Sequence, residues 1–309
     1  MASEPKSLIG QIVAITGAAR GIGRGTAEIL VRHGAKVAIG DIETEMAEQT
    51  ASDLGPSAKA YNVDVTDRLS VDRFLDGVVE DFGRVDVVIN NAGIMPVGPF
   101  LEESDEVAHR QIDINLHGVI YGTKGALHRM LPANRGHIIN IASAAGKTGY
   151  PGIATYSATK HAVVGLSEAV RAETLETGID VSVVMPVLVN TELGSGVEPG
   201  RLVRKLEAED VAQAIVDTIR KPKFEVPVPR ETGAMVKGSR LLPRKAQDRL
   251  AQFLGTDTML TDFDAEDRSA YDGRIGQKRD KDARPADAKS GEREPEGKAS
   301  KSTADKVEA

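Results

Sequence analysis

Apolar and polar positions alternate with two different periods between residues 11 and about 228. Short runs rich in β-branched residues are separated by longer stretches whose apolar residues recur at the spacing of one helix face. The runs predict strands at 11–16, 36–40, 58–63, 85–90, 136–142, 180–185 and 224–228. The stretches between them predict helices at 21–32, 43–54, 68–82, 104–131, 154–177 and 208–220. This alternation predicts right-handed crossovers, and hence an α/β fold: a doubly wound three-layer sandwich with a seven-stranded parallel sheet.

The pattern changes after Pro229. Residues 233–255 interleave large apolar side chains with lysine and arginine, and Pro243 is expected to divide this basic amphipathic segment into two short helical pieces. Beyond about residue 264 large apolar side chains become rare, which predicts a charged, largely disordered tail, with disorder from about residue 276. The expected regions are a flexible N-terminus (1–8), one catalytic domain (9–230), the amphipathic segment (231–263) and the tail (264–309).

Composition narrows the range of functions. The chain has no cysteine, which excludes disulfides, thiolate metal sites and cysteine nucleophiles, and no metal site is expected. A net charge of −7 gives no general basic footprint for nucleic acid. No secretory signal and no apolar run of about 18 residues is visible, so a cytoplasmic enzyme is expected. For residues 233–255, packing against the same or a neighbouring subunit is favoured over peripheral contact with a membrane.

The first predicted strand runs into a glycine-rich turn, Thr-Gly-Ala-Ala-Arg-Gly-Ile-Gly at residues 16–23, and a predicted helix follows. Backbone amides at a helix N-terminus bind phosphate, and positions without a side chain let it approach closely. A simple tight turn is the alternative, because such a motif alone is weak evidence. In this context the turn predicts a dinucleotide site formed by Gly17, Gly21, Ile22 and Gly23.

Two charged residues bear on the choice of dinucleotide. Asp41 ends the second predicted strand 18 residues after Gly23, close to the spacing of about 20 expected of a ribose-binding carboxylate. Such a carboxylate accepts both ribose hydroxyls and repels a 2′-phosphate, whereas Arg20 in the phosphate loop could pair with that phosphate. The position of the carboxylate is the more direct test, so NAD is favoured and NADP is less favoured.

Further candidates lie at the carboxyl ends of the next two strands, where open α/β sheets bind ligands. Asp64, beside Val65, could accept the adenine amino group; capping of the next helix is the alternative, and Thr66 and Asp67 are better placed for that. Small residues after the fourth strand would let the second ribose lie against the backbone: Asn91, Ala92 and Gly93.

The candidate catalytic residues are Tyr156, Lys160, Ser143 and Asn115. Tyr156 and Lys160 are four apart at the start of a predicted helix, so they share one face. A nearby ammonium and an oxidised nicotinamide favour the phenolate, which can then take an alcohol proton. Ser143 can hydrogen-bond the substrate oxygen, and Asn115 is expected to hold a water that links Lys160 to solvent. Each residue alone has an ordinary structural explanation; their joint occurrence on one βαβ array indicates an enzyme.

The residues at 16–23 and 90–93, with Asn115, Ser143 and the Tyr-Ser-Ala-Thr-Lys run at 156–160, resemble the classical short-chain dehydrogenase/reductase family. The resemblance covers about residues 8 to 230 and implies a Rossmann fold, NAD(P) as cofactor, an Asn-Ser-Tyr-Lys tetrad and a homotetramer or homodimer. Thr191 matches the residue expected to bind the nicotinamide carboxamide. One departure is that Pro186 is followed by Val187 where the family usually has glycine.

Positions expected to face the substrate are mostly apolar: Met95, Pro96, Val97, Ala144, Ala145, Tyr150, Val187, Leu193 and Val197. No arginine clamp occurs among them, which predicts a lipophilic secondary alcohol or ketone without a carboxylate or phosphate. The alternatives are a non-catalytic dinucleotide-sensing Rossmann protein, which would have no use for Ser143, Tyr156 and Lys160 together, and an epimerase or dehydratase, which would need polar and basic substrate loops.

Overall fold

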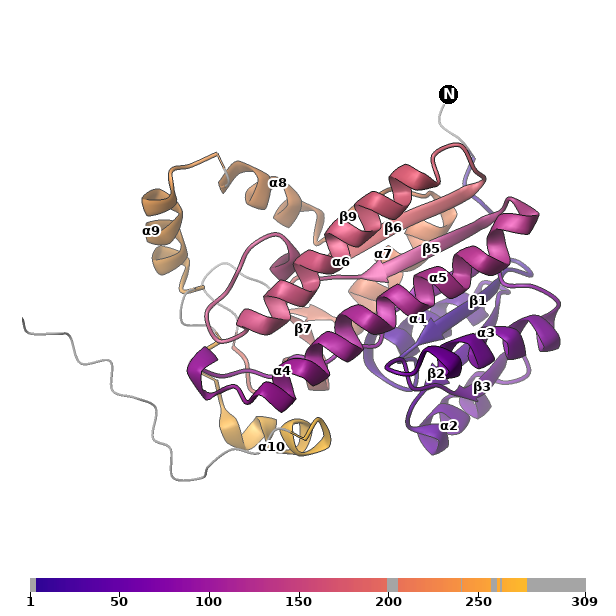
Figure 1. Cartoon of the computed structure of the whole chain (residues 1–309), viewed down its shortest axis with the longest axis horizontal. Coiled ribbons are helices and arrows are strands. Elements are labelled where there is room, and N and C mark those ends of the chain that lie inside the picture. Colours follow the sequence, from indigo (N-terminus) through magenta and orange to yellow (C-terminus); the bar gives the residue numbers. More distant parts are fainter. Residues whose placement is uncertain (1–3, 199–204, 240, 257–259, 262, 277–309) are drawn as a thin grey trace, which may run out of the picture. The chain divides into compact units, whose positions relative to one another are not determined.

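The computed structural model describes residues 4–198, 205–239, 241–256, 260–261 and 263–276 (Figure 1). Seven parallel strands form one sheet in the order β3-β2-β1-β4-β5-β6-β9, which confirms the predicted fold class. The strands are β1 (Ile12–Thr16), β2 (Lys36–Asp41), β3 (Ala58–Asn62), β4 (Val87–Asn90), β5 (Gly136–Ile141), β6 (Ile179–Pro186) and β9 (Glu225–Val228). A short parallel pair that the pattern did not predict lies outside this sheet: β7 (Val189–Asn190) and β8 (Leu206–Glu207).

Helices cover both faces of the sheet because successive strand residues point to opposite sides. Val13 and Ile15 of β1 pack with α1 (Gly21–Arg32), α2 (Thr44–Leu54) and α7 (Ala208–Arg220). Ile12 and Ala14 pack on the other side, with α3 (Arg68–Phe82) and α5 (Gly118–Met130). The helices α4 (Asp105–Ile112), α5 and α6 (Ala154–Glu173) lie on the face turned toward the viewer in Figure 1.

The order of the sheet fixes where a ligand can bind. β1 pairs with β2 on one side and with β4 on the other, so the chain leaves β1 and β4 toward opposite edges of the sheet. The crevice between the carboxyl ends of these two strands is the switch point at which open α/β sheets bind ligands.

Two of the predicted helices are wrong in detail. The helix expected at 104–131 is interrupted by a π-helical turn, Asp113–His117, between α4 and α5. The helix expected to end at residue 177 ends at Glu173, where the Thr174 hydroxyl donates back to the Val170 carbonyl oxygen at 3.0 Å. A side chain that bonds the backbone of its own last turn competes with continuation of the helix.

The C-terminal part is more ordered than its composition predicts. α8 (Arg230–Ser239) and α9 (Arg244–Leu254) lie on either side of Pro243, as two helical pieces were predicted to. The expected charged tail begins with an ordered stretch, α10 (Ala265–Arg274), which ends before residue 276, from which disorder is expected. Asp264 caps this helix by accepting from the amides of Glu266 and Asp267. The rest of the expected tail lies outside the described residues. Within the described part of the chain, no helix has the length and apolar content to cross a membrane.

Candidate active site

The turn after β1 brings backbone rather than side chains to the switch point. Gly17 and Gly21 have φ of +65° and +54°, a region that favours glycine. A Cβ on Gly17 would lie 2.8 Å from the Cα of Ala92, and one on Gly23 would lie 2.4 Å from the carbonyl oxygen of Gly17. Arg20 stands at the N-cap of α1 without a capping side-chain bond. The first amides of α1 are therefore available to an anion, which fits a pyrophosphate.

Asp41 ends β2 and lines the cavity beside the turn after β1. Its Oδ2 accepts from the Ala19 amide at 3.0 Å and its Oδ1 accepts from the Glu43 amide at 3.1 Å. These bonds hold the carboxylate against the phosphate loop, and each oxygen keeps a second lone pair for a ribose hydroxyl.

Asp64 and Asn91 are held in the loops of the cavity wall. Asp64 Oδ1 accepts from the amide and the hydroxyl of Thr66, whereas α3 is capped by Asp67, as the spacing indicated. Asn91 Nδ2 donates to the carbonyl oxygens of Thr16 and Gly17 at 2.9 and 2.8 Å. Asn91 thus ties the end of β4 to the phosphate loop. The cavity wall includes residues 63–66 and 91–95.

The structure brings Ser143, Tyr156 and Lys160 together at the carboxyl end of β5. Tyr156 and Lys160, on the first turns of α6, are 5% and 4% exposed. The Lys160 ammonium lies 5.5 Å from the centroid of the Tyr156 ring and donates to the Ile141 carbonyl oxygen at 2.9 Å. Ser143 Oγ accepts from the Ala145 amide at 3.1 Å and donates to the Pro186 carbonyl oxygen at 3.4 Å.

Burial shifts the pKa values of Tyr156 and Lys160 in opposite directions. It raises the pKa of Tyr156 well above 10, a hydrogen bond with Ser143 lowers it, and the neighbouring Tyr271 raises it. Burial also lowers the pKa of Lys160 to about 8. In this environment the phenol is protonated at neutral pH and the lysine is mostly charged. The phenol is therefore ready to give a proton to a carbonyl, while proton abstraction requires added positive charge nearby.

Asn115 lies in the π-helical turn and is completely buried. Its Oδ1 accepts from the Ile94 amide and its Nδ2 donates to the Ile94 carbonyl oxygen, both at 2.8 Å. Nδ2 also donates to Thr159 Oγ1 at 3.4 Å. Both Nδ2 protons thus go to protein groups, and Asn115 fixes the loop after β4 against α6, in keeping with π-turns at functional sites. That Asn115 also holds a water that links Lys160 to solvent stays a prediction.

The switch point opens into a cavity of about 1550 Å³ that runs from Gly17 to α10. Beside Tyr156 its wall is apolar, as predicted, and the expected residues that line it are Met95, Ala144, Ala145, Tyr150, Val187 and Leu193. Pro96, Val97 and Val197 are buried and do not line it.

The missing glycine after Pro186 causes no strain in the described structure. Asn134 is the one non-glycine residue with positive φ in the part of the chain that the structure describes, so Val187 has an ordinary backbone conformation. Its amide donates to the Val228 carbonyl oxygen at 3.0 Å. The departure from the family pattern at Val187 is therefore compatible with an ordinary turn after β6.

Sequence reasoning missed the C-terminal wall of the cavity, to which Leu260, Tyr271, Arg274 and Ile275 belong. Tyr271 Oη accepts from the Met95 amide at 2.9 Å, and burial raises its pKa to about 12. The Arg268 guanidinium, 0% exposed, donates to the carbonyl oxygens of Leu193 and Ser195 at 3.1 and 2.9 Å and to that of Met95. Helix signals were present: Asp264 at the start, acidic residues in the first turn and Arg274 in the last.

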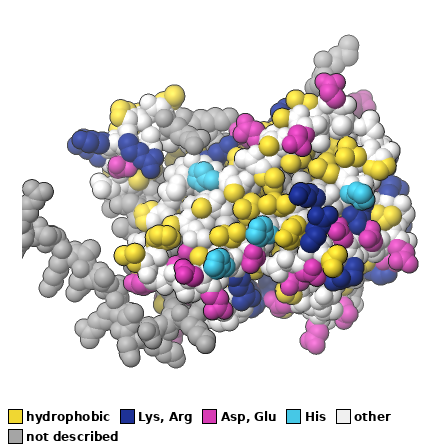
Figure 2. All heavy atoms as spheres, viewed as in Figure 1, with side chains coloured by type: hydrophobic (Ala, Val, Ile, Leu, Met, Phe, Trp, Pro, Cys, Tyr) yellow, Lys and Arg dark blue, Asp and Glu magenta, His cyan; other side chains and the backbone are white. Residues whose placement is uncertain are grey.

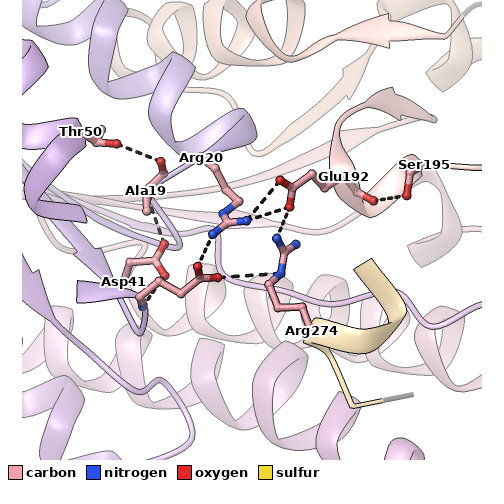
Figure 3. A network of polar contacts seen from close by, with 8 residues as sticks. Ala19, Arg20, Asp41, Thr50, Glu192, Ser195 and Arg274 are labelled. Atoms are coloured by element: carbon pink, nitrogen blue, oxygen red, sulfur yellow. Dashed lines mark hydrogen bonds and ion pairs between the residues drawn. The ribbon is translucent and has the colours of Figure 1, made fainter. Parts of the chain in front are cut away.

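Four charged residues meet across the mouth of the dinucleotide crevice (Figure 3). Arg20 Nη1 lies 2.9 Å from Glu192 Oε2, and Arg20 Nη2 contacts Glu43 Oε2. Arg274, at the end of α10, contacts the same two carboxylates, Glu192 through Nη1 and Glu43 Oε1 at 3.8 Å. We call Arg20, Glu43, Glu192 and Arg274 the charge cluster.

Fold and site together define an NAD(P)-dependent oxidoreductase that acts on CH–OH groups: a glycine cradle at the switch point, and a buried tyrosine and lysine with a half-buried serine beside an apolar cavity. Residues 11–201 match the family model described as short chain dehydrogenase. The chain therefore belongs to the short-chain dehydrogenase/reductase family.

Relatives and solved structures agree with this assignment. The chain is 39% identical over 192 residues to sorbitol dehydrogenase of Cereibacter sphaeroides, covering 62% of this chain and 75% of the relative. It is 34% identical over 248 residues to human 17-beta-hydroxysteroid dehydrogenase 13, covering 78% and 82%. The fold is similar to a short chain dehydrogenase/reductase from Burkholderia phymatum in complex with NAD, with a TM-score of 0.68, 27% identity, and coverage of 75% of this chain and 93% of that one.

Proposed function

We propose that this chain interconverts a lipophilic secondary alcohol and the corresponding ketone, with NAD(H) preferred to NADP(H). The observation that carries the proposal is the apolar wall around Tyr156, formed by Met95, Ala145, Ile153 and Leu260. An apolar pocket with few polar groups binds apolar ligands and uses those groups for orientation. Human epidermal retinol dehydrogenase 2, 33% identical over 81% of this chain, has a name that points to a lipophilic alcohol.

Ser143, Tyr156 and Lys160 carry the proton chemistry in this proposal. Ser143 Oγ binds the substrate oxygen, and Tyr156 Oη gives its proton to that oxygen during reduction or takes it during oxidation. Lys160 supplies positive charge that lowers the cost of the phenolate. NAD(P), bound at residues that include Gly17, Arg20, Gly21, Ile22, Gly23, Asp41, Asp64, Val65, Asn91, Ala92, Gly93 and Thr191, supplies or accepts the hydride.

A turnover screen tests the substrate class. Purified protein is incubated with NAD⁺ and a panel of hydrophobic secondary alcohols, sugar alcohols and small anionic hydroxy acids, and the absorbance of reduced nicotinamide is followed. Hydrophobic alcohols are expected to give the highest kcat/KM. A panel led by sugar alcohols or by hydroxy acids would refute the lipophilic assignment. Tight NADH binding without turnover of any substrate would favour the non-catalytic sensor.

Preference for NAD(H) is supported by Asp41, whose carboxylate is held by two amides where the ribose hydroxyls are expected. A 2′-phosphate would meet this anion, and like charges at that distance disfavour binding. Comparing KM for NAD⁺ and NADP⁺ tests this point. A tenfold preference for NADP⁺ would overturn it.

A homodimer or homotetramer is the assembly we propose, through the face that carries α4, α5 and α6. Figure 2 shows hydrophobic side chains gathered over α5 and α6 on this face. The outer side of α6 has the small residues Ala162, Gly165 and Ala169, which permit close helix approach. Sedimentation equilibrium should give a mass of two or four chains. A monomer at micromolar concentration would contradict this assembly.

A further inference from the structure

The charge cluster joins four segments that are far apart in the sequence. Arg20 belongs to the phosphate loop, Glu43 to the turn after β2, Glu192 to the turn after β7, and Arg274 to the end of α10. Figure 3 shows Arg20 and, from α10, Arg274 both reaching Glu192. The same two arginines also pair with Glu43. Arg20 is therefore held by two anions at once.

This arrangement changes what Arg20 can bind. A guanidinium in the phosphate loop, close to the adenosine ribose, suits a 2′-phosphate because it can donate two parallel hydrogen bonds. Arg20 instead directs Nη1 at Glu192 and Nη2 at Glu43. The two carboxylates therefore compete with a phosphate for the donors of this guanidinium.

The local charge balance opposes a second phosphate as well. Asp41, Glu43 and Glu192 bring three negative charges and the two arginines bring two positive charges, which leaves one net negative charge on these five residues. Partial burial disfavours ionisation of Glu192, but hydrogen bonds from Arg274 and Arg20 outweigh it and lower its pKa. A 2′-phosphate would add about two more negative charges at neutral pH.

We propose that Glu43 and Glu192 determine the dinucleotide specificity of this enzyme by occupying Arg20, and that Arg274 holds Glu192 in that position. The arginine that would otherwise admit NADP(H) is thereby kept from it, and α10 takes part in the choice of cofactor. The inference rests on the proposed preference for NAD(H) and adds the residues that enforce it.

Stability is a poor alternative explanation for the cluster. Glu43 and Glu192 have 39% and 55% of their side-chain surface exposed, and ion pairs this exposed stabilise a fold little. Their common feature is that all four members line the cavity in which the dinucleotide would lie. Their position in the cavity is required for a role in cofactor specificity, whereas a role in fold stability would not require it.

The test measures binding rather than turnover. Dissociation constants for NADH and NADPH are determined by calorimetric titration for the wild-type protein, for the double variant Glu43→Gln with Glu192→Gln, and for Glu28→Gln. Glu28 is the matched control, because it pairs with Arg24 at 2.9 Å and is 38% exposed, but does not line the cavity. A triple variant that adds Arg20→Gln asks whether the effect passes through Arg20.

The double variant is expected to bind NADPH about 10-fold more tightly than the wild type, while NADH affinity changes less than about 3-fold. Glu28→Gln should leave both constants unchanged, and Arg20→Gln should reverse the gain for NADPH. An unchanged ratio of the two constants in the double variant, or the same change in the control, would overturn the inference. If the double variant does not fold, as judged by circular dichroism, Glu192→Gln alone is expected to shift the ratio in the same direction.

Failure of the two proposals can be told apart. A wild-type protein that binds NADPH as tightly as NADH would refute the preference for NAD(H), and with it this inference. A wild-type protein that prefers NADH, with double and single variants that keep the same ratio, would refute only the assignment to Glu43 and Glu192.

Discussion

The crevice at β1–β4 and the C-terminal segment 260–276 line the same cavity, but different kinds of contact hold their residues in place. The first consists of consecutive βαβ units, and its functional groups follow from glycines and carboxylates at strand ends. The second is one short helix, α10, anchored by Arg268 and Tyr271 to loops more than 70 residues earlier in the chain. The first region depends on local geometry, and the second on a few long-range bonds to buried groups.

Replacement of Tyr156 by phenylalanine should have the largest effect and should leave both regions folded. Loss of the phenol removes the proton donor and acceptor, so kcat is expected to fall about 10³-fold. The affinity for NADH and the thermal unfolding midpoint should stay close to the wild type. Steady-state kinetics with the best alcohol of the screen and calorimetry measure these quantities. A loss of less than about 10-fold would remove Tyr156 from its catalytic role.

Arg268→Met should separate the two regions. Arg268 is fully buried and pairs with Asp272 at 3.2 Å, and breaking such a pair costs about 3 kcal/mol or more. We expect α10 to leave the cavity, KM for the alcohol to rise about 10-fold, and NADH affinity to be retained. Limited proteolysis should cut the variant within 260–276.

The control for Arg268→Met is Ser269→Ala, a change on the exposed side of α10. It should match the wild type in KM and in protease resistance. If Arg268→Met weakened NADH binding as much as alcohol binding, the crevice and the C-terminal segment would depend on each other. That result would contradict their separate stabilisation.

Lys160, on α6, lines the cavity that both regions share, and its burial predicts a pH effect. Its pKa is 10.5 when exposed and about 8 in the folded protein, so the unfolded chain binds more protons between these values. The wild type should therefore gain stability as pH rises from about 8 to 10.5, relative to Lys160→Met, by about 3 kcal/mol. Urea unfolding of both proteins at the two ends of this window measures the difference. A constant difference would mean that the ammonium is not desolvated.

Loss of a helix cap should have the smallest effect, and each of the two regions has one such cap that can be removed by the same substitution. Asp67 accepts from the Leu69 amide at the start of α3, and Asp264 accepts from the Glu266 amide at the start of α10. Replacing either by alanine should cost about 1 kcal/mol. For Asp67→Ala the loss should appear in global unfolding. For Asp264→Ala it should appear as about 5-fold faster proteolysis of 260–276 with unchanged global stability. The same response in both variants would contradict the separation of the two regions.

Sequence periodicity sufficed for the sheet and for the residues that depend on local spacing. The predicted α1, α3 and α7 have the observed bounds. Tyr156 and Lys160 share a helix face because they are four residues apart, and Ser143 follows a strand end that the pattern located.

The roles of the other residues of the site depend on contacts between residues far apart in the sequence, which local sequence patterns cannot predict. Asn115 is a candidate from the sequence, but its bond to Ile94 across the π-turn joins residues 21 apart and could not be foreseen. Arg268 looks like an exposed residue in a charged segment, and only its bonds to Leu193 and Ser195 explain its burial. Glu43 and Glu192 had no apparent role until the fold placed Arg20 between them.

Deuterium transfer tests the central claim most directly. The wild type is incubated with NADH deuterated at C4 of the nicotinamide and with the lipophilic ketone that corresponds to the best alcohol of the screen. Mass spectrometry of the product should find one deuterium on the carbinol carbon with the wild type, and incorporation about 10³-fold slower with Tyr156→Phe. Tight NADH binding without deuterium in any ketone product, or equal transfer by the Tyr156→Phe variant, would contradict the claim that this site performs hydride exchange through Tyr156.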